Sequence, residues 1–175
     1  MDTFETYREE LKLSRQAFEA AHSYPFLIMR KSGEELRGGK VTYATTWEPL
    51  APMTAPPAPV AQDLSDVLIF KVRPRPESFF PKLVSIGRDE SCDVAIPDGR
   101  VSRVHASIER LPQGDRYMLF DSGSRNGTKL NGRNVAKGER VKLSFGDNIK
   151  LGGFWLEFVS AGHLYDRLRR ALKDP

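Results

Sequence analysis

The chain has 175 residues, 39% of them apolar, and a formal net charge of +4, so it has room for one ordinary domain plus an extension and only mildly favours anionic partners. No apolar run approaches the roughly 20 residues that a membrane-spanning helix needs, and the acidic start lacks the basic region of a signal peptide. The single cysteine, Cys92, excludes an internal disulfide, so we expect a reducing, cytoplasmic location.

The N-terminal part is predicted to be an extension over residues 1–48, formed by a helix and a hairpin. Apolar residues recur at helical spacings over residues 2–22, which indicates an amphipathic helix that packs on the rest of the chain or docks on a partner. Residues 26–29 and 41–47 have strand composition, and the glycines between them allow a hairpin. Residues 49–63 are rich in proline and are predicted to be an extended linker.

From residue 64 to 160 the sequence predicts a mainly β domain. Nine short segments have strand composition: 67–72, 83–86, 93–96, 104–109, 117–120, 128–130, 140–143, 148–151 and 154–159. Asn131-Gly132 is a strong hairpin signal, because both residue types accept the positive φ of a type I′ turn. Many short strands without a long helical pattern favour an antiparallel β-sandwich.

The C-terminal residues 161–175 are predicted to be a short helix. Leu164, Leu168 and Leu172 recur at four-residue spacing, and arginines lie on the other sides. Such a helix covers an edge of the sandwich or offers a basic surface to an acidic partner.

Three polar loops between the predicted strands contain the candidate ligand-binding residues: Gly87-Arg88, Ser102–His105 and Ser124–Thr128. A phosphorylated side chain has about −1.5 to −2 charges and three acceptor oxygens, so its binding needs cations, hydroxyls and free amides. Arg88 supplies a forked cation, and Gly87 lets the backbone approach closely. These loops therefore favour a site that holds a phosphate without transforming it.

The same motifs, in this order, resemble those of the forkhead-associated (FHA) family over about residues 64–160. The matching segments are Gly87-Arg88, Ser102–His105, Asp121–Thr128, Asn131-Gly132 and Gly146–Ile149. The resemblance implies an eleven-stranded β-sandwich that reads phosphothreonine peptides with the loops at one end. It also implies a non-enzymatic module, with no catalytic residue, no metal and no cofactor.

Roles for single residues follow from this resemblance. Arg88 and Ser102 match residues that hold the phosphate, and Asn126 matches the asparagine that bonds the peptide main chain. Arg103 and Arg125 lie at positions where the family varies, so direct phosphate contact by these two is an open alternative.

The resemblance also implies structural support around the site. His105 matches a buried histidine that braces the loops, and Thr128 is expected to do the same, beside Gly87 and Gly127. Arg100 lies in the loop that reads the side chain three positions after the phosphothreonine, and would favour an acidic residue there.

The expected partners are phosphothreonine proteins of Ser/Thr kinase signalling, including the kinase or its substrates. A phosphorylated N-terminal tail is a further candidate, because Thr45 and Thr46 lie just before the linker and Glu48 follows Thr45 by three residues. Two alternatives stay open: an FHA-fold scaffold without phosphate dependence, and a nucleic-acid regulator that uses the basic C-terminal helix. We expect neither membrane nor nucleic acid as a partner.

Overall fold

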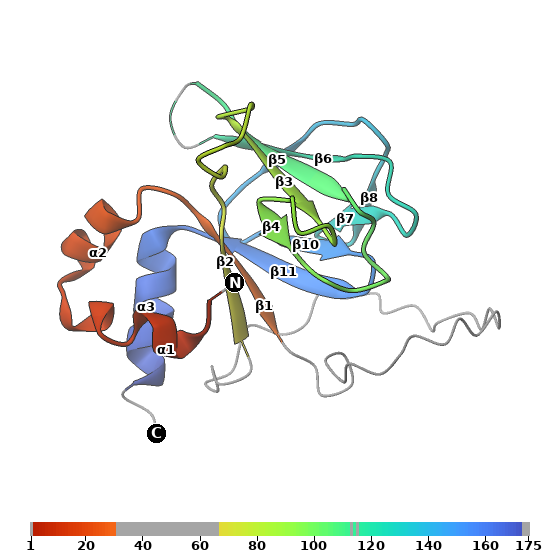
Figure 1. Ribbon diagram of the computed structural model, residues 1–175. Helices are drawn as coiled ribbons and strands as arrows, with labels where there is room; N and C mark the ends of the chain where they lie inside the picture. The colour runs from red at the N-terminus through yellow and green to blue at the C-terminus, as the bar shows by residue number, and fades with distance from the viewer. Residues whose placement is uncertain (1, 31–66, 113, 115, 173–175) are drawn as a thin grey trace.

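The computed structural model describes residues 2–30, 67–112, 114 and 116–172, and within them two β-sheets pack face to face (Figure 1). The strands are β1 (Phe26–Arg30), β2 (Val67–Lys71), β3 (Leu83–Gly87), β4 (Val94–Ala95), β5 (Ala106–Arg110), β6 (Tyr117–Asp121), β7 (Thr128–Leu130), β8 (Arg133–Val135), β9 (Val141–Leu143), β10 (Asn148–Leu151) and β11 (Phe154–Val159). One sheet has the order β2-β1-β11-β10-β7-β8 and the other β4-β3-β5-β6-β9. All the pairings whose register is known are antiparallel except β3–β4, so the predicted β-sandwich is confirmed.

The main core lies between the two sheets. Strand β11 shows how the sequence forms it: Phe154, Leu156 and Phe158 alternate with more exposed residues and point to the inside. Ile86 and Leu119 meet them from the five-stranded sheet. This alternation is the pattern expected of strands with one buried face.

The N-terminal part is organised differently from the expected separate extension. Strand β1 pairs with β11 on one side and with β2 on the other, so it is an interior strand of the six-stranded sheet. Its Leu27 and Met29 belong to the main core. The sandwich therefore begins before the Pro-rich segment and not at residue 64. Residues 41–47, the linker over 49–63, and Thr45 and Thr46 lie outside the described residues.

The single helix predicted over residues 2–22 is replaced by three short ones. These are α1 (Phe4–Tyr7), the 3-10 turn η1 (Glu10–Lys12) and α2 (Arg15–Ala21). The break has a local cause, because Leu13 is extended and Ser14 caps α2 by accepting a hydrogen bond from the N–H of Ala17 at 3.2 Å. The periodic apolar residues of this segment still pack on the rest of the chain, since Tyr7, Leu11 and Phe18 are all fully buried.

The predicted C-terminal helix is α3 (Ala161–Ala171), and it joins α1, η1 and α2 in a layer beside β1 and β2 (Figure 1). Their apolar side chains form a second buried cluster outside the sandwich, with Phe26 and Ile28 on the outer face of β1. The hydroxyl of Tyr165 donates to the carbonyl of Leu13 at 2.8 Å, which ties the two termini together. No helix in the described part of the chain is long and apolar enough to cross a membrane.

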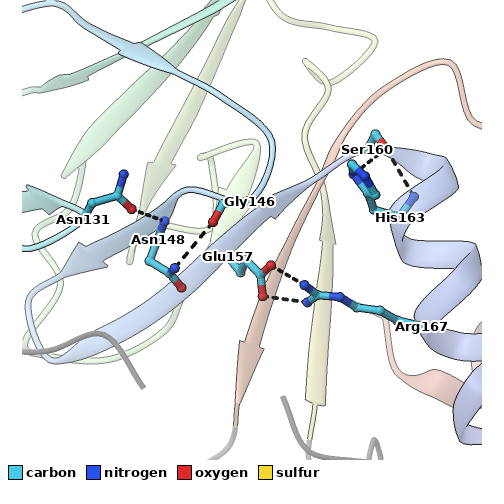
Figure 2. A network of polar contacts seen from close by, with 7 residues as sticks. All are labelled: Asn131, Gly146, Asn148, Glu157, Ser160, His163 and Arg167. Carbon is cyan, nitrogen blue, oxygen red and sulfur yellow. Dashed lines mark hydrogen bonds and ion pairs between the residues drawn. The ribbon is translucent and has the colours of Figure 1, made fainter. Parts of the chain in front are cut away.

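Two polar contacts attach α3 and the β7–β8 turn to the central strands β11 and β10 of the six-stranded sheet (Figure 2). Both terminal guanidinium nitrogens of Arg167 on α3 donate to the carboxylate of Glu157 on β11. The amide oxygen of Asn131 accepts from the N–H of Asn148 at 2.8 Å, and Asn131 and Gly132 have φ of 51° and 87°. The predicted hairpin at Asn131-Gly132 is thus confirmed, and it creates the unpredicted strand β8.

Candidate functional site

The three polar loops singled out in the sequence meet at one end of the sandwich. They are the β3–β4, β4–β5 and β6–β7 connections. The N–H of Arg88 donates to the carbonyl of Ser102 at 2.9 Å, and the N–H of Arg125 donates to the Ser102 hydroxyl at 3.0 Å. Ser102 therefore links all three loops.

Gly87 permits the close approach between the first two loops. A Cβ at this position would lie 2.0 Å from the carbonyl oxygen of Arg103, far inside a van der Waals contact. Arg103 uses that carbonyl to accept from the N–H of Asp89 at 3.2 Å and from the thiol of Cys92 at 3.2 Å. Cys92 is buried, and burial raises the pKa of its thiol, so it stays protonated and packs under the loop.

His105 is completely buried beneath the loops and joins two of them. Its Nδ1 accepts from the N–H of Ser102 at 3.1 Å, so the proton lies on Nε2, which donates to the carbonyl of Gly127 at 3.1 Å. Burial lowers the pKa of His105, which keeps the ring neutral and preserves this pair of bonds.

Asp121 at the end of β6 organises the third loop, and the sequence reasoning assigned it no role. Its carboxylate accepts from the N–H groups of Gly123 and Ser124, both at 2.8 Å, and from the hydroxyls of Ser124 and Thr128, both at 2.6 Å. Burial alone would raise the pKa of Asp121, but these hydrogen bonds outweigh it and hold the pKa below its usual value. Thr128 is therefore held to the loop through Asp121.

The exposed side of the site is rich in cations. Arg88, Arg103 and Arg125 are all exposed, and none of them forms a hydrogen bond or ion pair through its guanidinium with another described residue. A shallow hollow beside them is lined by Asp89, Ser91, Ser102, Arg103 and Val104. A hydrogen bond from the Ser91 hydroxyl is the main cause that lowers the pKa of Asp89, and the positive charges of Arg103 and Arg88 lower it further.

Asn126 and Arg100 form the other side of the site. The Asn126 amide nitrogen donates to the carbonyl of Arg100 at 2.7 Å, which leaves the amide oxygen without a hydrogen bond to any described residue. The Arg100 guanidinium is held by both carboxylate oxygens of Asp98, at 2.9 and 3.0 Å, and lies 4.5 Å above the Phe154 ring. Arg100 is thus a fixed side chain and not a loose turn charge.

Replacement of His105 by alanine is expected to lower stability and to weaken ligand binding indirectly. The variant leaves the part-buried N–H of Ser102 without its acceptor, at about 1–3 kcal/mol, and leaves the carbonyl of Gly127 with only the longer bond from the N–H of Gly152 at 3.5 Å. A thermal melt measures the loss, and His163→Ala is the matched control because His163 is exposed. Equal melting temperatures for His105→Ala and the native chain would show that His105 does not brace the loops.

Comparison with known proteins agrees with this geometry. The family model "FHA domain" matches residues 84–152. An oxoglutarate dehydrogenase inhibitor of Corynebacterium jeikeium is 37% identical over 99 residues, which are 55% of this chain and 65% of that protein. The serine/threonine-protein kinase cds1 of Schizosaccharomyces pombe is 37% identical over 71 residues, 38% of this chain and 15% of the kinase. The chain thus spans less than two thirds of either relative.

Among solved structures, the N-terminal FHA domain of Saccharomyces cerevisiae Rad53p with a phosphothreonine peptide is 25% identical, with a TM-score of 0.46. That match covers 57% of this chain and 89% of the Rad53p domain. The family match spans strands β3 to β10 and contains all three loops of the site. The chain therefore carries a forkhead-associated domain.

Proposed function

We propose that this chain binds phosphothreonine segments of other proteins and so mediates phosphorylation-dependent association in Ser/Thr kinase signalling. The observation that carries the proposal is the junction at Ser102, where hydrogen bonds from backbone N–H groups bring the exposed residues Arg88 and Arg125 next to Ser102 and its neighbour Arg103. The proposed role is binding and not catalysis, because the site offers positive charge and hydrogen-bond donors, which are what the capture of a phosphate requires.

Arg88 and Ser102 are the proposed phosphate ligands. The Ser102 oxygen accepts from the Arg125 N–H, so the hydroxyl proton can donate to a phosphate oxygen. The Arg88 guanidinium can offer two parallel N–H donors to the same group, and such charge-assisted pairs are the strong ones. Arg103 and Arg125 add positive charge at the rim, and direct contact by these two is part of the proposal.

Asn126 is the proposed contact to the peptide main chain. Its amide nitrogen is already engaged with Arg100, which fixes the plane of the amide and presents the oxygen as an acceptor. A backbone N–H of the peptide is the matching donor. Gly127, with φ of 74°, supplies the left-handed turn that aims this loop.

The two alternatives make different demands on the chain. A nucleic-acid regulator would need the arginines of α3 to be available to phosphates. Arg167 is instead paired with Glu157, and Arg169, although exposed, donates to the carbonyl of Leu11 at 3.1 Å. A scaffold without phosphate dependence would not need Arg88, whose guanidinium forms no hydrogen bond or ion pair with another residue that the structure describes.

A degenerate phosphothreonine peptide library tests the proposal. The full chain is immobilised, and the retained peptides are sequenced before and after phosphatase treatment of the library. We expect enrichment only from the untreated library. Equal retention after phosphatase would favour the phosphate-independent scaffold.

Selectivity for an acidic side chain three positions after the phosphothreonine is proposed to depend on Arg100. The pair with Asp98 neutralises much of the Arg100 charge, so an acidic peptide residue must share the guanidinium. We therefore expect a modest preference, of about 0–1 kcal/mol, that disappears in Arg100→Ala and increases in Asp98→Asn. A library with the same preference in all three proteins would rule Arg100 out.

We also propose that the chain's own Thr45 or Thr46, once phosphorylated, binds in the same site and blocks other peptides. A short tether gives an effective concentration of order millimolar, enough to saturate a micromolar site. Kinase-treated chain is expected to bind a library-selected peptide more weakly than kinase-treated Thr45→Ala/Thr46→Ala. Both proteins keep residues 1–30, because β1 is part of the sandwich. Equal affinities would exclude self-capture.

A further inference from the structure

The most exposed apolar side chains of the described residues lie far from the phosphate site, in the loop that precedes β3. Phe79 is 94% exposed and Phe80 is 65% exposed. The other large exposed apolar residues are 38–48% exposed and occur singly. Two adjacent phenylalanines that stand out into water are costly for a soluble domain and mark a surface that contacts something else.

Hydrogen bonds within the loop fix the backbone that carries the two exposed rings. The N–H of Ser78 donates to the carbonyl of Arg75 at 3.0 Å, and the N–H of Phe80 donates to the Ser78 hydroxyl at 3.3 Å. The N–H of Arg75 is anchored to the Asp93 carboxylate at 2.7 Å, and the N–H of Leu83 to the carbonyl of Phe80 at 3.1 Å. The two rings are therefore presented on a fixed turn, which lowers the entropic cost of using them.

Basic residues lie on the segments that are joined to the base of this tip by backbone hydrogen bonds. Lys82 follows Phe80 by two residues, and its carbonyl accepts from the N–H of Arg110 at the end of β5 at 2.8 Å. Arg116, whose carbonyl accepts from Leu111, lies across the same β5–β6 connection. Figure 1 shows residues 73–82 beside the end of β5 at the top of the sandwich. Glu77 is the single acidic residue of the loop over 73–82.

We propose that the Phe79-Phe80 tip, with Lys82, Arg110 and Arg116 behind it, docks the domain on an anionic phospholipid surface. The rings would enter the boundary between headgroups and acyl chains, and the cations would face the headgroup phosphates. Contact at a bilayer surface was not expected from the sequence, which only argues against a membrane-spanning helix.

Two other occupants fit this tip less well. A second copy that met it through the same patch would bring Lys82, Arg110 and Arg116 against themselves, which like charge disfavours. A folded protein partner needs roughly 1,000 Å² of buried surface for a stable interface, whereas two phenylalanines supply about 150–250 Å² each. A lipid surface needs no such continuous area, because each apolar and each basic side chain contributes by itself.

The position of the tip makes this docking compatible with ligand capture. Strand β3 begins at Leu83, just after the tip, and ends at Gly87, just before Arg88. Five residues of strand separate the two places by roughly 15 Å along the sheet. A domain held on a bilayer by Phe79 and Phe80 would therefore direct the Arg88 loops away from the lipid.

Vesicle sedimentation with the full chain tests the proposal. The probes are large unilamellar vesicles of phosphatidylglycerol and phosphatidylcholine in equal parts, and of phosphatidylcholine alone. We expect the native chain to sediment with the anionic vesicles and to be released by high salt. The double variant Phe79→Ser/Phe80→Ser should bind at least about tenfold more weakly, while melting as the native chain does.

Control variants distinguish binding through the Phe79-Phe80 tip from nonspecific binding to vesicles. Leu13→Ser, which changes a half-exposed apolar residue elsewhere, should bind vesicles as the native chain does. Phe79→Trp should show a blue-shifted emission relative to the native chain when anionic vesicles are added. Native binding no stronger to anionic vesicles than to phosphatidylcholine, or unchanged binding by the double variant, would overturn the proposal. Tip-dependent self-association in sedimentation velocity without vesicle binding would also overturn it.

Discussion

Arg88→Ala is expected to abolish phosphopeptide binding while the domain stays folded. Each charge-assisted hydrogen bond is worth about 1.5–3 kcal/mol, and the forked guanidinium should make two of them to the phosphate. If the native affinity is near micromolar, about −8 kcal/mol, the variant retains too little free energy for detectable binding. Titration calorimetry with a library-selected phosphothreonine peptide measures the loss.

Two controls sharpen this result. Arg88→Lys keeps the charge but loses the fork, so we expect intermediate binding. Arg8→Ala removes an exposed arginine that pairs only locally with Glu5, and should bind as the native chain does. Because the Arg88 guanidinium bonds no other described residue, Arg88→Ala should melt at the native temperature. Equal affinity of Arg88→Ala and the native chain would remove Arg88 from the site.

Deletion of residues 1–30 is expected to unfold the domain, although the deleted part lies outside the family match. The deletion removes β1 from between β2 and β11, and with it the buried residues of both apolar clusters: Tyr7, Leu11, Phe18, Phe26, Leu27, Ile28 and Met29. At about 1.5–3 kcal/mol for each buried side chain, the loss of about 10–20 kcal/mol is as large as, or larger than, the roughly 5–15 kcal/mol by which domains are stable. Far-ultraviolet circular dichroism and a thermal melt report the outcome.

A single substitution gives a graded form of the same experiment. Phe18 is fully buried where α2 meets α3, so Phe18→Ala should destabilise the chain by about 3–5 kcal/mol. Leu13→Ala, at a half-exposed position in the same segment, should cost far less. A cooperative melt at the native temperature for the deleted chain would show that the N-terminal part is a separate module after all.

The sequence predicted those parts of the fold whose signals are local. Strand composition located β11, and the Asn131-Gly132 turn located the β7–β8 hairpin. The loops of the site could be found because each combines a special residue type with its neighbours, as Gly87 does with Arg88. Their meeting at one end follows from the sandwich.

What the sequence did not reveal depends on contacts between distant segments. Strand β1 has the composition of a strand, but its partners β2 and β11 follow it by about 40 and 130 residues along the chain, so its place in the sheet has no local signal. The helix expected over residues 2–22 breaks where Leu13 is extended and Ser14 caps α2, and its periodic apolar residues still reach one buried cluster with β1 and β2. Asp121 was present in the quoted motif, and an Asx turn before Gly123 could have suggested its role.

The measurement that tests the central claim most directly compares one peptide in two states. A library-selected peptide is titrated into the full chain with phosphothreonine and, in the same buffer, as the same sequence with unmodified threonine. The account predicts binding of micromolar strength for the first and none that calorimetry detects for the second. Equal affinity for the two peptides would contradict phosphothreonine recognition by the Arg88, Ser102 and Asn126 loops.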